Sequence, residues 1–363
     1  MKIPAITFKG NLLQTFRAFT GNPLQFLNQY ALNPEGISQF NILHHRIVHV
    51  SEPKHLKHLL LASQEQYTQS RDRDHMQLLF GNGLLTSTGQ HWKKQRALIQ
   101  PAFGKKNLEK FAEKINYQLG RFPLPTQKTF DLHAYSLNLV NHIIADLTFS
   151  RTDAGTLQTG NQLMDLKAET LARLQHFSPP LWLPTPANLR YKKRRKTVYN
   201  FIQKLITKRK ESGENHPDLL DAFRLASNKT TGKGMSEEEL REELLGVYAA
   251  AHEPVAIALT YTLFLVANHP EVAAKLQQEA QKILTGPEPN FKTIEKLVYT
   301  KQVAQEALRL YPPVWISGKR ALQPHNLNGY DIRKNDNFIF SPMIVHRHPD
   351  HWPEPDKFMP ERF

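Results

Sequence analysis

The residues with the clearest chemical potential lie in a long apolar stretch, Ser236 to Pro270. Three small residues, Ala249 to Ala251, precede His252, Glu253 and Pro254 at its centre. Small side chains allow a ligand to approach the backbone, and a buried Glu requires a partner or a shifted pKa. Proline removes one intrahelical hydrogen bond, so we expect the helix to open locally at Pro254. The pattern predicts either a helix bent over a ligand or a core helix with a polar patch at its centre.

The same stretch carries the signals of one long helix. Ser236 and Glu239 form a capping box, and the run of acids suits the positive end of a helix dipole. The apolar residues beyond Leu240 predict burial on most sides, and the sequence Asn268-His269-Pro270 predicts the end. Leu244 to Ala267 has the length of a membrane span, about 20 residues. Its ionisable centre argues against one, since such groups are costly in lipid, and we expect no transmembrane segment.

A second pair of residues is suited to holding an anion. Trp92 and Arg96 follow the glycine-rich turn around Gly81 at a spacing of i and i+4, which places them on one helix face. An indole N–H and a guanidinium together can hold a carboxylate. The alternative is a surface cation–π pair, which the spacing alone favours.

A third pair, Glu306 and Arg309, shares one face of a helix predicted over Ile294 to Leu310. Tyr311-Pro312-Pro313 and the surrounding apolar residues predict that this pair is buried. The alternative is a surface salt bridge, which would contribute little to stability.

The composition limits the classes of protein to which this chain can belong. A net charge of +14 over 363 residues favours acidic partners or anionic surfaces, and the absence of cysteine excludes disulfides and thiolate chemistry within these residues. The basic run Arg190 to Lys196 fits a solvated helix face better than a nucleic-acid patch. We therefore expect no nucleic-acid partner. Met1 to Leu13 contains no signal-like apolar core, so we expect a cytoplasmic location.

The elements that must position these residues are mostly helices. Helical patterns cover the ranges 108–119, 132–149, 218–226, 271–284 and 294–310. Asn41 to Val50 predicts a strand before a helix that Ser51-Glu52-Pro53 opens, and Val314 to Ile344 alternates as strands with turns at Asn328-Gly329 and Lys334-Asn335. The fold class predicted is mainly α with a small β region.

Taken in order, these segments resemble the cytochrome P450 haem-thiolate monooxygenases from about Gly81 to Phe363. The motifs that carry the resemblance are Trp92-x-x-x-Arg96, Ala250-Ala251-His252-Glu253, Glu306-x-x-Arg309 before Leu310-Tyr311-Pro312-Pro313, and Phe358-x-Pro360-Glu361-Arg362-Phe363. A single motif of this kind is common by chance, whereas all of them in the right order are highly specific. The implied fold is one cytochrome P450 domain over residues 1–363 that lacks its C-terminal part.

The resemblance implies a role for each group of residues. The cofactor would be haem b, whose propionates would be held by Trp92, Arg96 and Arg320. A buried ion network would join Glu306, Arg309 and Arg362. The catalytic groove would be formed by Ala250, Ala251, Glu253 and Pro254. Substrate contacts would come from 74–85, 177–183, 249–254 and 314–317, among them Leu78, Leu84, Val314 and Ile316.

The implied reaction inserts one atom of O2 into an apolar substrate, such as a fatty acid or terpenoid. NAD(P)H would supply electrons through a ferredoxin- or flavin-type partner, which Lys93, Lys94, Arg96, Lys105 and Lys106 would attract. We expect a monomer.

Two departures from the family pattern affect this expectation. The family's metal ligand is a cysteine beyond the P-E-R-F segment, and these residues contain none, so we expect a truncated chain that is inactive as an oxygenase. Pro254 also stands where the family usually has a threonine, which leaves proton delivery to Glu253 and water. The alternatives are a non-catalytic remnant, or a peroxide-using or isomerase-type haem enzyme in a full-length form.

Overall fold

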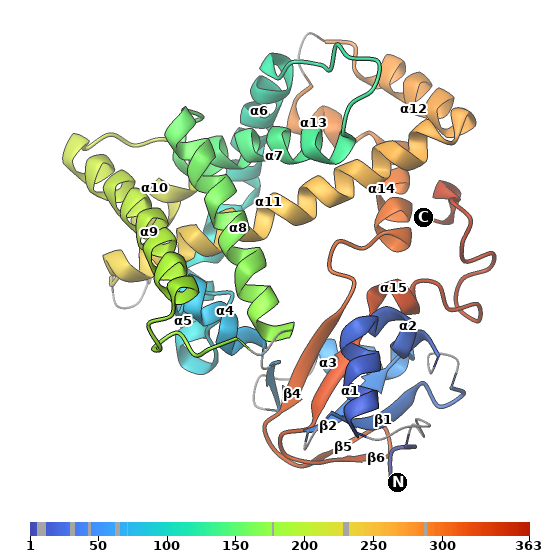
Figure 1. Ribbon diagram of the computed structural model, residues 1–363. Coiled ribbons are helices and arrows are strands. Elements are labelled where there is room, and N and C mark those ends of the chain that lie inside the picture. Colours follow the sequence, from blue (N-terminus) through green and yellow to red (C-terminus); the bar gives the residue numbers. More distant parts are fainter. Residues whose placement is uncertain are drawn as a thin grey trace. The chain divides into compact units, whose positions relative to one another are not determined.

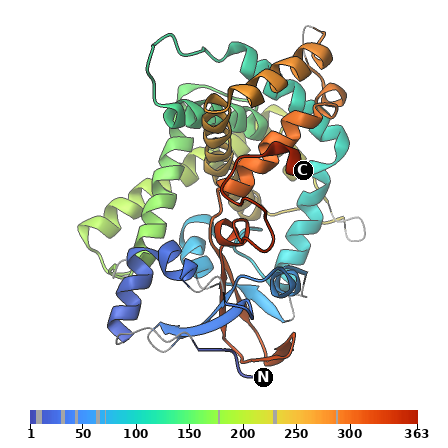
Figure 2. The ribbon, with the colours of Figure 1, turned by 90° about the vertical axis from the view of Figure 1, so that its right-hand side faces the viewer.

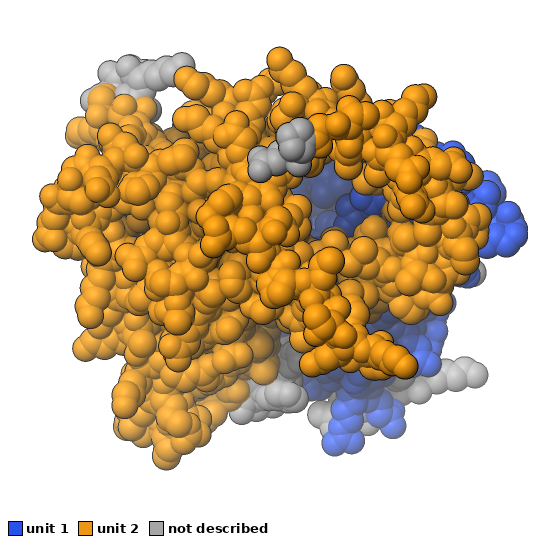
Figure 3. Space-filling view, turned by 90° about the horizontal axis from the view of Figure 1, so that it is seen from above, with its two compact units in different colours: residues 1–73, 304–363 blue, residues 74–303 orange. Residues whose placement is uncertain are grey.

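The computed structural model describes residues 1–5, 12–29, 33–42, 45–61, 66–70, 72–175, 178–227, 232–286 and 289–363. The chain divides into two compact units, which are coloured separately in Figure 3. Unit 1 comprises residues 1–73 and 304–363, and unit 2 comprises residues 74–303. Helices predominate and the sheets are small (Figure 1), so the predicted class, mainly α with a small β region, is confirmed. The single domain over residues 1–363 stays a prediction.

Unit 1 is built on a five-stranded sheet with the order β1-β2-β7-β4-β3. Strands β2 and β7 are parallel, and the other neighbouring pairs are antiparallel. The strands of this unit are β1 (Ile37–Ile42), β2 (His45–Val50), β3 (Tyr67–Gln69), β4 (Ser317–Ala321), β5 (His325–Leu327), β6 (Tyr330–Ile332) and β7 (Asn337–Phe340). Its helices are α1 (Leu12–Gly21), α2 (Pro23–Asn28), α3 (Pro53–Leu61), α15 (Pro342–Val345) and the short 3-10 helix η2 (Pro360–Arg362).

The alternation of side chains in the sheet produces two apolar faces. Val48 and Phe338 belong to a core on one face, and Phe40 and Ile339 pack with residues of α1 and α2 on the other. Figure 2 shows the segment after α15 (red) as an irregular loop that ends at η2. Strand β4, which carries Arg320, lies between β7 and β3 in this sheet.

Unit 2 is helical and surrounds one apolar core. Its helices are α4 (Asp72–Phe80), α5 (Gly89–Ile99), η1 (Gln100–Phe103), α6 (Lys105–Arg121), α7 (Leu132–Phe149), α8 (Ala154–Gln175), α9 (Pro186–Ser212), α10 (Leu219–Arg224), α11 (Glu237–Ala267), α12 (Pro270–Ile283) and α13 (Phe291–Ile294). Helix α14 (Val298–Leu310) begins in unit 2 and ends in unit 1. Helix α4 likewise crosses the boundary, from unit 1 into unit 2.

Helix α11 is the long central helix that the sequence predicts. Its capping box is present, because Ser236 Oγ accepts from the Glu239 N–H at 3.1 Å and the Ser236 N–H donates to Glu239 Oε2 at 2.8 Å. The helix packs most extensively against α7, where Tyr248 donates a hydrogen bond to Asn141 at 2.9 Å. By length and composition α11 could cross a membrane, although the core helices of soluble proteins pass the same test.

Two expectations for α11 differ from the structure. The helix continues through Pro254 from Glu237 to Ala267, because losing one hydrogen bond does not interrupt a helix supported on both sides. Burial on most sides is also wrong for the second half, where Val255, Tyr261 and Phe264 are exposed. The physical reason is that the apolar run is longer than the core of unit 2, whose buried members on this helix end at Ala249.

Candidate functional site

The centre of α11 presents different residues on different sides. Ala250 is exposed and Pro254, one turn later, is half-buried, while His252 is buried. Glu253 is not the buried carboxylate that its apolar surroundings suggest: its side chain is 48% exposed and pairs with Lys167 of α8 at 2.7 Å. The reason is helical geometry, since Glu253 lies about 100° around the helix from Pro254. The carboxylate can therefore exchange protons with water, and its neighbour is a cation.

His252 is held inside unit 2 as a structural group. Its Nε2 lies 3.2 Å from the carbonyl oxygen of Leu137, and its ring is stacked on Tyr248. Burial lowers the pKa of His252 below its usual value. A neutral imidazole that carries its proton on Nε2 donates this hydrogen bond to the Leu137 carbonyl oxygen. The contact therefore does not require a charged ring.

Helix α5 brings Trp92 and Arg96 together as their spacing predicts. The guanidinium carbon of Arg96 lies 5.1 Å from the centre of the Trp92 ring. Arg96 is exposed, as is the adjacent Lys93, whereas Lys94 is paired with Glu239 at 2.6 Å. This contact is the cation–π pair considered above, and it also leaves the guanidinium N–H groups directed to solvent, where an anion can reach them.

Arg320 occupies an inner strand of the unit 1 sheet. Strand β4 lies between β3 and β7, with Arg320 opposite Thr68 and Asn337. Its Nε is buried and has no hydrogen-bond partner within the described residues. A buried donor without a partner costs about 1–3 kcal/mol, which an anionic ligand would offset.

The three residues expected to form an ion network lie together in unit 1. Glu306 and Arg309 are fully buried and form a bidentate pair, with Nε–Oε2 at 2.6 Å and Nη2–Oε1 at 2.8 Å. Arg362 adds an Nε–Oε1 contact at 3.2 Å, and the Met359 N–H donates to the same carboxylate at 3.0 Å. Arg309 also donates to the carbonyls of His346, Pro355 and Lys357. The pair is therefore fully hydrogen-bonded, as a buried ion pair must be.

The four residues expected to contact a substrate lie in different surroundings. Leu84 packs against the core of unit 2, Leu78 is partly exposed at 39%, and Val314 is exposed in a loop. Within the wider ranges, Phe177 lies outside the described residues and Trp182 is exposed on a surface turn.

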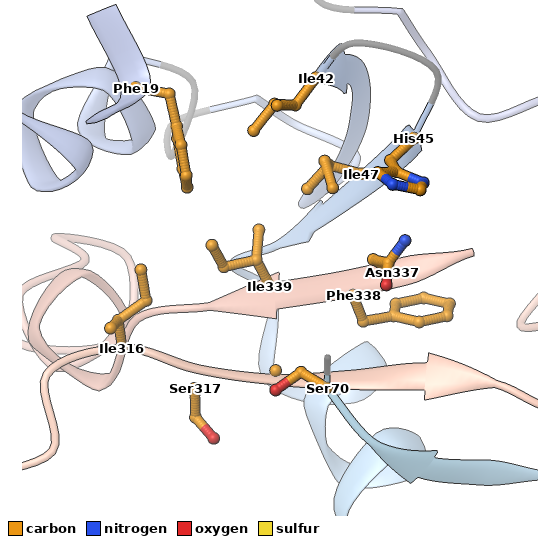
Figure 4. A pocket seen from close by; sticks show the side chains of 11 residues that line it. Phe19, Ile42, His45, Ile47, Ser70, Ile316, Ser317, Asn337, Phe338 and Ile339 are labelled. Carbon is orange, nitrogen blue, oxygen red and sulfur yellow. The ribbon is translucent and has the colours of Figure 1, made fainter. Parts of the chain in front are cut away.

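Ile316 lines a cavity of about 310 Å³ in unit 1. Figure 4 shows Ile316, Ile339 and Phe19 directed toward one space beside the sheet. His45 and Asn337 lie at one end of the lining and supply polar atoms. A cavity with apolar walls and a few polar groups is typical of small-molecule sites, although its size is near the lower limit of about 300 Å³ for such sites.

Two functional neighbours were missed in the sequence. Lys167 lies in α8, for which no helix was predicted, and one sequence gives no signal that it meets Glu253. Glu243 is buried beneath the turn at Gly81 to Leu84. A signal for it did exist, because Glu243 falls three residues after Leu240 on the apolar face of α11.

Comparisons with known proteins found a matching family and several relatives. The family model described as "Cytochrome P450" matches residues 2–363. Pentalenene oxygenase of Streptomyces avermitilis is 30% identical over 302 residues, which cover 82% of this chain and 66% of the relative. Cyclooctat-9-en-7-ol 5-monooxygenase of Streptomyces melanosporofaciens is 29% identical over 300 residues, covering 80% of this chain and 64% of the relative. The Arabidopsis thaliana protein LUTEIN DEFICIENT 5, chloroplastic, is 27% identical, with 86% and 56% covered.

The family match extends over almost the whole chain, whereas the matched part is about two thirds or less of each of these relatives. Of the motif residues, Trp92 and Arg96 lie in α5, Glu253 in α11 and Glu306 in α14. The chain belongs to the cytochrome P450 family.

Proposed function

We propose that the protein of which these residues are part is a haem-dependent monooxygenase that acts on an apolar organic substrate. Haem, when bound, supplies the iron chemistry by which one oxygen atom of O2 enters the substrate. The family match and the two relatives named as an oxygenase and a monooxygenase support this proposal. Because those relatives carry the names of terpene-derived compounds, we infer a terpenoid-sized substrate.

The observation that carries the cofactor proposal is the buried, unpartnered Nε of Arg320. A guanidinium in this state fits a carboxylate ligand, and haem b carries two propionates. Trp92 and Arg96 provide further donors for such a group, and Arg96 is exposed. We assign these three residues to the propionates. The 363 residues contain no cysteine to ligate the iron, so we expect them to bind haem without thiolate ligation.

The remaining catalytic residues have roles that follow from their surroundings. Ala250 and Ala251 are small and would let the cofactor and substrate approach the α11 backbone. Pro254 cannot donate a proton, so Glu253 would move one between water and its carboxylate, beside Lys167. Exposed Lys93, Lys105 and Lys106 would attract an acidic ferredoxin- or flavin-type partner that passes on electrons from NAD(P)H. We propose a cytoplasmic location, because the ionisable centre of α11 opposes membrane insertion of this helix. The monomeric state stays a prediction.

The cofactor proposal is tested by titrating the chain with haem and following the Soret band. R320Q should weaken haem binding about tenfold or more, because it removes a charge-assisted hydrogen bond of about 1.5–3 kcal/mol. R46Q is the matched control, since Arg46 lies in the same sheet but is already paired with Asp336 at 2.9 Å. Equal haem affinities for R320Q and the unmodified chain would refute the assignment of Arg320.

A non-catalytic protein is the second candidate. Incubation with haem, pentalenene, O2, NADPH, ferredoxin and its reductase separates the activity of this chain from that of the family. We expect no oxygenated product from the 363 residues. Product formed with peroxide alone would instead favour the peroxide-using alternative.

A further inference from the structure

Glu243 contacts the glycine-rich turn before α5. This contact belongs neither to the proposed haem site nor to the ion network of Glu306. The Leu84 N–H lies 2.8 Å from Oε1 and 3.0 Å from Oε2 of Glu243, so one backbone donor is shared by both carboxylate oxygens. The neighbouring Glu242 accepts from the Asn82 N–H at 2.9 Å. Two successive residues of α11 therefore hold two alternate amides of the turn.

The glycines of this turn allow the backbone to approach the two carboxyl groups closely. Gly81 has a φ of +69°, and a Cβ at this position would lie 1.8 Å from Glu242 Oε1. A Cβ on Gly83 would lie 3.3 Å from the Glu242 backbone and 3.4 Å from the Glu243 carboxyl carbon. The sequence F-G-N-G-L-L thus lets the backbone rest directly on the two carboxyl groups.

The seated turn places Leu85 over α11. A Cβ on Gly246 would lie 3.4 Å from Leu85 Cδ1, so the leucine covers this glycine. Gly246 lies one turn before Ala250 on the same helix face, and both Leu85 and Ala250 are exposed. Leu85 therefore stands at the edge of the face of α11 that carries the proposed catalytic residues.

We propose that Glu243 is a positioning residue: through the Leu84 amide it seats the Gly81–Leu84 turn on α11 and so holds Leu85 against Gly246, where an apolar ligand lying over Ala250 would contact it. The contact between Leu85 and an apolar ligand rests on the proposed function. The seating of the turn does not.

The charges around Glu243 determine how the stability of this contact depends on pH. Glu239 and Glu242 of α11 oppose its ionisation, and burial raises its pKa to about 7. Near the turn, Lys94 of α5 is committed to Glu239, and His91 of α5 contacts the Asn82 carbonyl. Cations of α9 and α11, Arg195 and Arg241, act on Glu242.

No cation donates to the Glu243 carboxylate within the described part of the chain. Opening the turn hydrates Glu243 and returns it toward its ordinary pKa. The open form therefore binds fewer protons, and rising pH favours it.

Amide hydrogen exchange of the 363-residue chain tests the seating directly. The protection factor of the Leu84 amide should fall between pH 5 and pH 8, by up to about 70-fold if opening fully hydrates the carboxyl. In E243Q, which stays neutral and keeps an acceptor oxygen, protection should be high and independent of pH. In E243A it should be lost at every pH. E242Q is the comparison variant: it should alter protection of Asn82, and it should weaken but not abolish the pH dependence at Leu84, because Glu242 is only one of the causes of the raised Glu243 pKa.

Ligand binding separates this proposal from the proposed function. With pentalenene as the probe at pH 6, E243A should bind about tenfold more weakly than the unmodified chain, and E243Q within about twofold. No binding by the unmodified chain would refute the proposed function and leave the seating intact. Equal binding by E243A and the unmodified chain would refute the role of Glu243 in ligand binding. Leu84 protection that does not vary with pH in the unmodified chain, or that is as low in E243Q as in E243A, would refute the seating itself.

Discussion

Replacing Glu306 by alanine should be among the most destabilising single changes in unit 1. The carboxylate accepts from Arg309 at 2.6 and 2.8 Å, from Arg362 at 3.2 Å and from the Met359 N–H at 3.0 Å, and it is fully buried. Removing it leaves the Arg309 charge buried without a counter-ion. Breaking a buried pair in this way costs about 3–5 kcal/mol, whereas an exposed pair contributes about 0–1 kcal/mol.

The assay is urea unfolding followed by the fluorescence of Trp315 and Trp352, which both lie in unit 1. Variants of the chain with Trp92 and Trp182 changed to phenylalanine restrict the signal to this unit. For a slope of about 2 kcal/mol per molar urea, a loss of about 4 kcal/mol lowers the midpoint by about 2 M.

K357A is the matched control, because it removes an exposed pair with Glu354 from the same loop. K357A should change the free energy of unfolding by less than about 1 kcal/mol. A loss below about 1 kcal/mol in E306A would refute the reasoning, since the pair would then behave as if it were solvated.

Three further changes test other contacts. G81A should lower the free energy of unfolding of unit 2 by about 2 kcal/mol or more, because the new Cβ meets Glu242 and the backbone there is left-handed. G89A is the control in the same thermal or urea unfolding: Gly89 has a φ of +60° but open space around it, so this change should cost only about 1–2 kcal/mol. The raised pKa of Glu243 means that the folded state keeps a proton that the unfolded state loses near its ordinary pKa of 4.5. The free energy of unfolding should thus fall by about 3 kcal/mol as pH rises from 4.5 to 7. E243Q should abolish this pH-dependent fall. A free energy of unfolding that rises over this window as Glu243 ionises would contradict the prediction. E253Q should change the free energy of unfolding by less than about 1 kcal/mol, because its ion pair is half-exposed, and a larger loss would show that this pair is buried in solution.

Much of the helical framework could be predicted, because residues close to each helix end determine where the helix begins or ends. Helix α7 occupies the predicted range, Leu132–Phe149, and the Ser236 capping box starts α11. The turns at Asn328 and Asn335 adopt the positive φ that these residues tolerate. The strand predicted over Asn41 to Val50 instead belongs to β1 and β2, because apolar alternation does not reveal where a chain reverses.

The surroundings of the site were harder to predict, because they depend on contacts between distant segments. The apolar neighbours of Glu253 suggest burial, yet its helical phase turns it toward Lys167, 86 residues earlier in the chain. Glu242 and Glu243 look like acids that favour a helix start, whereas they hold a backbone turn 159 to 160 residues away. The spacing of Glu306 and Arg309 could be recognised, but the carbonyl oxygens that complete the network come from an irregular loop.

Hydrogen–deuterium exchange with and without haem tests the central claim most directly. If these residues bind haem through the family's motifs, haem should slow exchange in α5 around Arg96, in α11 around Ala250 and in β4 around Arg320. The exposed face of α9 around Lys192 and Lys193 should be unchanged. Protection confined to other segments, or no protection at saturating haem, would contradict the account.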